Sequence, residues 1–329
     1  MIYMESLSPD PRWNLAMEQY VFEKLPKGSQ CIYFWRNHNT IVVGKNQNTV
    51  GEINNEFVRQ HGITVVRRMT GGGTVYQDLG NLNYSFIADA GEQGQIDFQR
   101  FCAVIVEALA SYGVAAQISG RNDITVDGKK FSGNAQLISH GRVLHHGTIM
   151  FSTDLEVLSK ALQVDQQKIE SKGIQSVTSR VTNLSEHLPA GTSMESLKSR
   201  ILTHISRQEP LVPYALTSTD RAAISAIVDK RYATWAWNYG KSPAYSINRK
   251  MRLENCGMLE VSYSVKDGVI QAIQLFGDFF GAVDVEELEQ RLTGCLCNAR
   301  SLAEALRGMP LDKYIRNISQ SDLIRLIIP

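Results

Sequence analysis

Three consecutive glycines follow a pair of arginines in the segment VVRRMTGGGTVYQDLGN, which runs from Val65 to Asn81. Because glycine has no Cβ atom, such a segment lets the backbone approach a ligand closely and direct several N–H groups toward an anion. An adjacent arginine adds a planar guanidinium group that suits phosphate or carboxylate. Consecutive side chains of a strand point to opposite faces, so Arg67 and Arg68 cannot both enter one pocket. We therefore predict a phosphate-binding loop served by one of the two arginines, rather than a hairpin with two solvated arginines.

The spacing of these glycines differs from the common nucleotide-binding motifs. The pattern GxxxxGK[ST] is absent, and the glycines are not spaced as GxGxxG ahead of a helix. If the segment binds a nucleotide, it does so from a strand–loop–strand element, which disfavours a kinase or a Rossmann dehydrogenase. No serine lies in a GxSxG motif, which disfavours a hydrolase of that class.

A second candidate site is the predicted hairpin around Lys129 and Lys130. The two lysines face opposite sides of their strand, so one can enter a site while the other is solvated. The small residues that follow them in KKFSGNA leave room for a ligand. Upstream, GRND ends in Asn122 and Asp123, whose amide and carboxylate could contact a base edge or hold Mg²⁺ through a water.

The histidines and cysteines do not form a recognisable metal motif. His145 and His146 are adjacent on a predicted strand and therefore diverge, and HExxH is absent. We expect a packed or pocket-lining histidine instead. The five cysteines are an odd number in a chain of 329 residues and match neither a disulfide framework nor a zinc site. Buried, reduced thiols are the expected state.

Composition limits the class of protein further. Lys and Arg together number 34 and Asp and Glu 33, and the resulting net charge of +1 disfavours non-specific binding of nucleic acid. No stretch approaches the roughly 18 uncharged apolar residues that a membrane span needs. The N-terminal sequence lacks the basic start and apolar region of a secretory signal, so we expect a cytoplasmic protein.

The elements that position these residues follow from patterning. Asp10 and Pro11 predict the start of a first helix, as N-cap and first helical residue. The apolar runs CIYFWR, TIVVG and ITVVRR predict strands before the glycines, and another strand follows them. Asp97 opens a second helix with an apolar stripe. The dipeptide Asp127-Gly128 predicts a type I′ turn into the lysine strand.

The sequence pattern of the C-terminal quarter is typical of a separate domain. The region 154–231 is mostly helical by pattern, and the segment TWAWNYGKSPAYS then connects it to a compact piece of about 85 residues. In that piece a hairpin, LEVSYSV-KDG-VIQAIQLF, precedes further helices. We predict an α+β fold with a large domain over residues 1–244 and a small α/β domain over residues 245–329. The large domain should contain a mixed, mainly antiparallel sheet flanked by helices.

Taken in order, the segments RRMTGGGTVYQDLGN, GRNDITVDGKKFSGNA, HHGT, SRVTNL and WAWNYGKSP resemble the bacterial lipoate–protein ligase family over nearly the whole chain. The order and spacing of several motifs make the resemblance far more specific than any one motif. The C-terminal piece with FGDFFG resembles that family's accessory domain, so residues 1–244 would be the catalytic domain. Related catalytic folds serve the biotin protein ligases.

The resemblance implies a ligase that uses ATP and Mg²⁺ in two steps. The carboxylate of lipoate first attacks the α-phosphorus of ATP, giving lipoyl-AMP and pyrophosphate. A lysine amine of a lipoyl-carrier domain then takes the acyl group and releases AMP. The implied carriers are E2 subunits of 2-oxoacid dehydrogenases and the glycine cleavage H protein, with no nucleic acid or membrane as a partner.

The resemblance also implies roles for individual residues. The essential lysine of the family's K-x-S-G-x-A motif falls on Lys130, and Asp123 is the candidate for holding Mg²⁺ with ATP. The positions that match ATP- or adenylate-binding residues are Arg68, Gly71, Gly72, Gly73, Thr74, Val75, Tyr76, Asn122, Asp123 and Lys130. The positions that match lipoate-binding residues are Trp35, Arg68, Lys130, His146 and Thr148.

One position departs from the family's pattern. Gln77 stands where the family usually has a histidine, and glutamine cannot shuttle a proton near neutral pH. The acceptor lysine has a reference pKa of about 10.4, so some other group must take its proton. The sequence does not identify that group, for which Asp123 is one candidate.

Two other functions fit parts of the sequence. An octanoyl or lipoyl acyltransferase of the same fold would need a nucleophilic cysteine near the lysine hairpin, and no cysteine lies between Gly120 and Thr148. A non-catalytic adenylate-binding protein should have lost Lys130 or the glycines, and both are present.

Overall fold

The computed structural model describes residues 1–90, 96–162, 180–239, 247–266 and 268–328. Its strands are β1 (Ile2–Glu5), β2 (Cys31–Trp35), β3 (Thr40–Val43), β4 (Thr64–Arg67), β5 (Val75–Gln77), β6 (Asn81–Asp89), β7 (Gln117–Ser119), β8 (Asp123–Val126), β9 (Lys129–Ser139), β10 (Arg142–Met150), β11 (Val212–Pro213), β12 (Ile247–Leu253), β13 (Gly257–Lys266) and β14 (Val269–Gly277). Its helices are α1 (Pro11–Lys24), α2 (Thr49–Glu52), α3 (Asn55–Gln60), α4 (Gln99–Ala110), α5 (Leu155–Ala161), α8 (Met194–Ser206), α9 (Ser218–Ile227), α10 (Trp235–Asn238), α11 (Glu286–Leu292), α12 (Ala299–Ala305), α13 (Leu311–Tyr314) and α14 (Gln320–Ile327), with the short helices η1 (Leu184–His187) and η2 (Val228–Tyr232).

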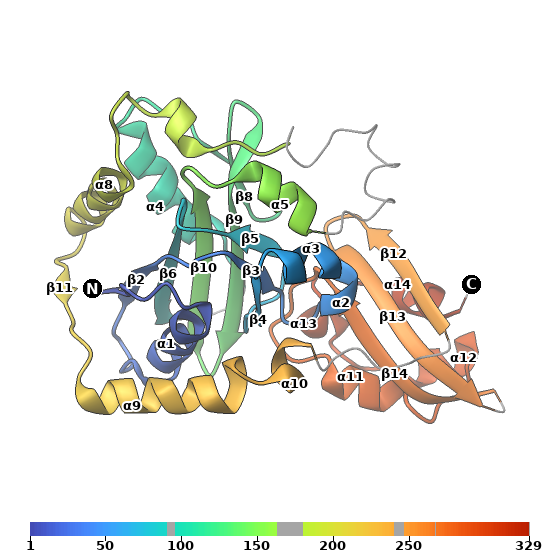
Figure 1. Cartoon of the computed structure of the whole chain (residues 1–329). Helices are drawn as coiled ribbons and strands as arrows, with labels where there is room; N and C mark the ends of the chain where they lie inside the picture. Colours follow the sequence, from blue (N-terminus) through green and yellow to red (C-terminus); the bar gives the residue numbers. More distant parts are fainter. Residues whose placement is uncertain (91–95, 163–179, 240–246, 267, 329) are drawn as a thin grey trace.

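The large domain is built on a mixed sheet with strand order β11-β1-β2-β6-β10-β9-β8-β7. β1 is parallel to both of its neighbours, and the pairs from β2 to β7 are antiparallel. A smaller sheet, of order β4-β3-β5, contains one parallel and one antiparallel pair. The predicted mixed, mainly antiparallel sheet flanked by helices is confirmed (Figure 1).

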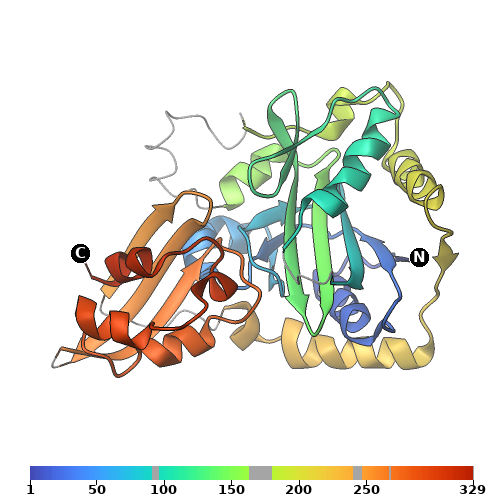
Figure 2. The same cartoon turned by 180° about the vertical axis from the view of Figure 1, so that it is seen from behind.

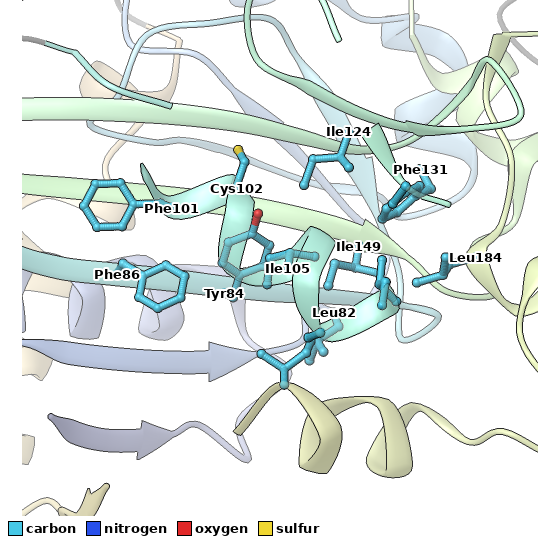
Figure 3. Close-up of a cluster of buried hydrophobic side chains, with 14 of the residues drawn as sticks. Leu82, Tyr84, Phe86, Phe101, Cys102, Ile105, Ile124, Phe131, Ile149 and Leu184 are labelled. Atoms are coloured by element: carbon cyan, nitrogen blue, oxygen red, sulfur yellow. The ribbon is translucent and has the colours of Figure 1, made fainter. Parts of the chain in front are cut away.

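Helices cover both faces of the large sheet. On one face α4 and α8 pack against the strands, and the rings of Phe86 in β6 and Phe101 in α4 lie with centroids 5.6 Å apart. Figure 3 shows Cys102 and Ile105 of α4 in this core beside Tyr84 of β6. On the other face, α1, α9 and residues of the small sheet form a second core. Burial on both faces explains why β2 is a continuous apolar run.

The predicted turns place the candidate lysine at the start of a long strand. Asp127 and Gly128 have φ values of 50° and 74°, the positive values that a type I′ turn requires, and they join β8 to β9 at Lys129. His140 and Gly141, with φ values of 52° and 73°, join β9 to β10. The two turns set the lysine strand beside the strand that carries the adjacent histidines.

The C-terminal domain is a three-stranded antiparallel sheet with strand order β12-β13-β14. Helices α11 to α14 pack against one face of this sheet around a separate apolar core (Figure 2). A small α/β domain at this end of the chain is therefore confirmed. Its predicted boundary, between residues 244 and 245, lies outside the described residues and stays a prediction.

The segment that follows β14 reaches into the large domain. Phe280 packs edge-to-face against Phe98, with ring centroids 5.2 Å apart, and the guanidinium of Arg121 lies 4.7 Å from the Phe280 centroid. Arg121 Nη2 also lies 3.7 Å from Asp278 Oδ2. Because Phe280 belongs to the core of the large domain, the FGDFFG segment joins the two domains.

Several strands were not predicted from the sequence, among them β1, β7, β11 and β12. β1, with the sequence IYME, is only four residues long and shows no alternation of apolar and polar residues. β12 carries Asn248, Lys250 and Arg252 on its exposed side, a pattern that protects an edge strand but makes it look like a loop. Within the part of the chain that the structure describes, no helix has the length and apolar character needed to cross a membrane.

Candidate functional site

A cavity of about 100 Å³ lies between the large sheet and the small sheet. β2, β6, β9 and β10 form one wall, β3, β5 and the glycine loop form another, and Leu15 of α1 completes the lining. The residues that line it are Leu15, Trp35, Asn37, Val42, Arg68, Gly73, Thr74, Val75, Gln77, Asn83, Asn122, Lys130, Gly133, Asn134, Ala135, His146, Gly147 and Thr148.

Lys130 enters this cavity, while Lys129 is exposed. Its Nζ lies 2.7 Å from Asp123 Oδ1 on the neighbouring strand, with about a third of each side chain exposed (33% and 37%). A Cβ atom on Gly133 would lie 2.9 Å from the same Nζ, so only glycine leaves the ammonium room to lie there. Thr182, in the segment SRVTNL, donates its backbone N–H to the Lys130 carbonyl at 2.9 Å and fixes the strand.

Arg68 is buried behind the glycine loop and lines the same cavity. Its Nη2 donates to the carbonyls of Gly71 and Gly73 at 2.7 and 2.8 Å, and its Nη1 to the Val42 carbonyl at 3.2 Å. Burial lowers the pKa of Arg68 to about 10, which still leaves it charged at neutral pH. In this structure the guanidinium therefore organises the loop by holding its carbonyl groups.

Arg67 points the other way, as the strand alternation predicted. Its Nη1 donates to the carbonyls of Gly44, Lys45 and Gln47, at distances of 2.7 to 3.0 Å. Its Nε donates to the Trp237 carbonyl at 2.9 Å. Arg67 thus ties three parts of the large domain together and takes no part in lining the cavity.

The three glycines have different surroundings. Gly73 lines the cavity, and a Cβ atom on it would meet no atom within 4 Å. A Cβ on Gly71 would lie 2.4 Å from the Phe279 carbonyl oxygen, and one on Gly72, whose φ is +89°, 3.2 Å from the Phe280 ring. The loop therefore exposes its backbone to the cavity at Gly73, whereas Gly71 and Gly72 contact the segment that follows β14.

A hydrogen-bonded chain connects the cavity histidine to Arg68. His146 Nδ1 lies 2.9 Å from Glu18 Oε1, and its Nε2 lies 2.8 Å from Thr70 Oγ1, which in turn accepts from Arg68 Nε at 2.9 Å. Glu18 also accepts from Ser85 and is almost fully buried. Sequence reasoning missed Glu18, because it lies 128 residues from His146 in the chain and its neighbours look like ordinary helix.

The other predicted site residues divide between the cavity and its surroundings. Trp35 and Thr148 line the cavity, and Thr148 Oγ1 accepts from the Gly133 N–H at 3.2 Å. Asn122 also lines it. Tyr76 does not, because alternate residues of β5 face opposite ways and its ring packs in the core under the small sheet. The lining residues on either side of Tyr76 in β5 are Val75 and Gln77.

The cysteines lie away from the cavity. All five are in the described part of the chain, and none lines the cavity. Burial raises the pKa of Cys31 and Cys102 to about 12 and that of Cys256 to about 11. A thiol with so high a pKa is a poor nucleophile at neutral pH. The geometry gives no support to a thioester route.

The arrangement is suited to holding an anion beside an apolar group. Lys130 and Arg68 place two positive charges at one cavity, whose other walls include Trp35, Leu15 and Val42. In a partly desolvated site, such charges interact with an anionic ligand more strongly than they would in water. A carboxylic acid with an apolar chain, activated by a phosphate compound, matches this distribution.

Two family models together match most of the chain. The model of the lipoyl protein ligase A/B catalytic domain matches residues 10–206, and the model of the bacterial lipoate protein ligase C-terminus matches residues 242–327. The lipoate-protein ligase LplJ of Bacillus subtilis is 44% identical over 321 residues, covering 97% of both chains. Lipoate--protein ligase 1 of Staphylococcus aureus is 44% identical over 318 residues, again covering 97% of both chains.

Solved structures share the fold. P. falciparum LipL1, solved in complex with lipoate, superposes with a TM-score of 0.81 at 24% identity and covers 99% of this chain and 98% of its own. A bi-partite lipoate protein ligase of Thermoplasma acidophilum, described with its E2 lipoyl domain, has a TM-score of 0.64 at 25% identity, covering 75% of this chain and 98% of its own. A lipoate-protein ligase A bound with ATP has a TM-score of 0.63 at 24% identity, covering 73% and 98%.

Proposed function

The chain belongs to the bacterial lipoate–protein ligase family, and we propose that it activates lipoate with ATP and transfers the lipoyl group to a lysine of a lipoyl-carrier domain. The observation that carries the proposal is the shared cavity. Lys130, Arg68 and the backbone of Gly73 line it together with Trp35 and His146. One cavity can therefore serve both the charged reacting groups and the apolar acyl chain.

In the activation step, a carboxylate oxygen of lipoate attacks the α-phosphorus of ATP, the bond from that phosphorus to the pyrophosphate oxygen breaks, and pyrophosphate leaves. The two reactants are both anionic, so fixed positive charge must hold them in line. We assign this task to Lys130 and Arg68. The ammonium of Lys130 has three donors, so it can keep its contact with Asp123 and still donate to ligand oxygens.

In the transfer step, the amine of the carrier lysine attacks the acyl carbon, the bond from that carbon to the phosphate oxygen breaks, and AMP leaves. The attacking nitrogen must lose a proton, and we assign Asp123 as its acceptor because its partly exposed carboxylate lies beside Lys130. Lipoyl-AMP is labile in water, so the cavity must retain it until the carrier arrives.

We propose Mg²⁺ as the ion that accompanies ATP. In proteins Mg²⁺ commonly takes one or two carboxylates together with substrate phosphates, and Asp123 would be the protein ligand here. When bound, the ion would neutralise phosphate charge. The proposed carriers are the E2 subunits of 2-oxoacid dehydrogenases and the glycine cleavage H protein; the pairing of the archaeal relative with its E2 lipoyl domain supports the first of these.

Lipoate-dependent exchange of labelled pyrophosphate into ATP tests the activation step. A ligase that forms lipoyl-AMP reversibly shows exchange that requires lipoate and needs no carrier. A non-catalytic adenylate-binding protein shows none, and neither does an acyltransferase that works through a thioester. Absence of exchange with folded, nucleotide-binding protein would overturn the proposed function.

A further inference from the structure

A chain of three buried amide side chains runs from α1 to the wall of the cavity. Asn14 Nδ2 donates to Asn37 Oδ1 at 2.9 Å, and Asn37 Nδ2 donates to Gln77 Oε1 at 2.7 Å. All three side chains are at least nine-tenths buried. Asn37 and Gln77 both line the cavity, whereas Asn14 lies behind them.

Backbone groups at one end fix the direction of this chain. Asn14 Nδ2 also faces the carbonyls of Ser8 and Arg36, at 2.9 and 3.1 Å. A carbonyl oxygen can only accept, so the Asn14 atom that faces both of them must be the NH₂ group. Asn37 must then turn its oxygen to Asn14 and its NH₂ to Gln77. The Gln77 oxygen must therefore accept the hydrogen bond from Asn37. The orientation of each amide follows from the one before it.

This direction leaves the NH₂ group of Gln77 for the cavity. Gln77 is only 5% exposed, and no acceptor for its Nε2 is found among the residues that the structure describes. An N–H donor that is buried without an acceptor loses the hydrogen bond that it makes to water. A ligand that fills the cavity must therefore supply an acceptor at Gln77 or lose affinity.

We propose that the Gln77 NH₂ group binds an oxygen of the acyl group of lipoate, first the carboxylate and later the acyl carbonyl. The proposal rests on the proposed function. The hydrocarbon chain of lipoate has no acceptor and its sulfur atoms are weak ones, so the carboxyl oxygens are the strong acceptors of this substrate. Asn37, which holds Gln77, comes two residues after Trp35 on the acyl-chain side of the cavity.

The contact would matter in both steps. A donor to a carboxylate orients lipoate for attack on ATP. When the carrier amine attacks the acyl carbon, negative charge grows on the same oxygen, and a fixed donor there stabilises the transition state. Gln77 is the substrate-binding residue in this account, and Asn37 is a positioning residue that acts through it.

Gln77→Met tests the contact directly, because methionine keeps the length and volume of the side chain and removes the donor to the ligand, together with the oxygen that accepts from Asn37. The measurement is pyrophosphate release with lipoate varied at saturating ATP, and then with ATP varied at saturating lipoate. We expect the KM for lipoate to rise about tenfold to a hundredfold, with the KM for ATP within about twofold of the parent value. Unchanged KM for lipoate, or an equal rise for both substrates, would overturn the proposal.

Asn37→Asp tests the direction of the chain. Aspartate still accepts from Asn14, but it has no NH₂ to offer, so Gln77 must flip and present its oxygen to the cavity. An acceptor facing the substrate anion should raise the KM for lipoate at least as much as Gln77→Met does. In the Gln77→Met variant, Asn37→Asp should raise the KM for lipoate little further, because residue 77 then has no amide that can flip.

Asn83→Asp is the matched control for the added charge. Asn83 is another buried asparagine of the cavity wall, and its contacts, to the Trp35 carbonyl and to Asn81, do not involve Gln77. Its effect on the KM for lipoate should multiply with that of Gln77→Met, as independent sites do. If the effect of Asn37→Asp on the KM for lipoate also multiplies with that of Gln77→Met, the added charge alone explains the effect. The proposed flip of the Gln77 amide would then be wrong.

A third substitution keeps the test valid if buried aspartate prevents folding. Asn37→Leu removes the hydrogen bond without adding charge and lets Gln77 turn freely, so we expect a smaller rise in the KM for lipoate than Gln77→Met gives. A KM equal to that of the parent would overturn the positioning role of Asn37. The parent enzyme reports on the proposed function separately: if it forms no lipoyl-AMP, the ligase assignment itself fails.

Discussion

Single side chains at this site are held by their neighbours more than by their own strands. Lys130 lies where Gly133 leaves space and Asp123 supplies a counter-charge. Arg68 donates hydrogen bonds to the carbonyl groups of the glycine loop and to Thr70. A ligand can therefore take the second hydrogen of Nη1, whereas a ligand that takes a hydrogen from Nη2 must compete with the loop.

Replacement of Lys130 tests the charge that the activation step requires. We expect Lys130→Ala to lower lipoyl-AMP formation by about a hundredfold to a thousandfold, the usual effect of losing one transition-state donor. Lys130→Arg should restore little, because a forked guanidinium cannot replace a compact ammonium beside Gly133. Lys129→Ala, at the exposed neighbour, serves as the control and should leave the rate unchanged. Near-normal rates for either Lys130 variant would remove the residue from this role.

Replacement of all five cysteines by serine tests the thioester alternative. None of the thiols lines the cavity, so a folded variant should form lipoyl-AMP at the parent rate. Circular dichroism and thermal unfolding would establish that the variant is folded, since Cys31 and Cys102 are fully buried and their replacement costs stability. A folded variant that has lost pyrophosphate exchange would revive the thioester route.

What the sequence could predict about these residues depended on how local their contacts are. Alternation along β4 correctly separated Arg67 from Arg68, but which of them faces the cavity came only from the resemblance. The partners of His146 and Gln77 could not be predicted. Glu18 and Asn37 reach them across long stretches of chain, 128 and 40 residues away, and polar residues with buried partners look the same in a sequence as polar residues in water.

Among the elements, the glycine loop is shaped from two sides. The Gly71 backbone lies against Phe279 and the Gly72 backbone against Phe280, while Gly73 faces the cavity. The glycines were predicted to give ligands access to the backbone. The structure adds a second physical reason for two of them, which is the close approach of another domain.

Substitutions in the loop separate these two reasons. Gly72→Val would place a branched side chain at φ +89° and within 3.2 Å of the Phe280 ring, so we expect it to displace the loop and raise the Kd for ATP steeply. Gly73→Ala meets no protein atom, so it should leave the thermal midpoint unchanged and affect only ligand binding. Isothermal titration with ATP and thermal unfolding would be compared. Parent-like ATP affinity in Gly72→Val would show that the loop is only a turn.

Elements with strong local signals were predicted well. Asp10 and Pro11 start α1, and Asp127-Gly128 forms its turn, because each depends on residues adjacent in the chain. The helix expected from Asp97 begins at Gln99, with Asp97 Oδ1 accepting from the Arg100 N–H at 3.2 Å. β12 was missed because its alternate residues Asn248, Lys250 and Arg252 are polar or charged and exposed, a pattern that is also typical of a loop.

At the scale of the whole molecule, the C-terminal domain closes one side of the catalytic domain. Phe280 lies in the core of the large domain, and Lys45 Nζ pairs with Asp284 Oδ2 at 2.8 Å across the same contact. The contact of the FGDFFG segment with the large domain was not predicted, because this sequence is typical of a loop that follows a strand. The cavity of about 100 Å³ is smaller than ordinary ligand pockets of roughly 300–1,000 Å³. We expect the loop or this domain to move when the two substrates bind.

We propose that the C-terminal domain covers the cavity and keeps water away from lipoyl-AMP. Removal of this domain tests the proposal. A chain that ends near residue 244 keeps Lys130 and Arg68 but loses Phe279 and Phe280, which pack against the glycine loop. We therefore expect lipoyl-AMP to form more slowly and to be lost to water more often. The measurement is the ratio of pyrophosphate released to carrier lipoylated, which should rise from about one in the full chain. Phe280→Ala in the full chain is the milder comparison, because it removes one core side chain at the contact and keeps the rest of the domain. An unchanged ratio in the truncated chain would end the cover proposal.

The most direct test of the account is mass spectrometry of a lipoyl-carrier domain after incubation with this protein, ATP, Mg²⁺ and lipoate. We expect one lipoyl group on a single carrier lysine, no modification when ATP or lipoate is left out, and modification at least about a hundredfold slower with the Lys130→Ala variant. Modification that proceeds without ATP, or that proceeds at a near-normal rate with Lys130→Ala, would contradict the proposed function.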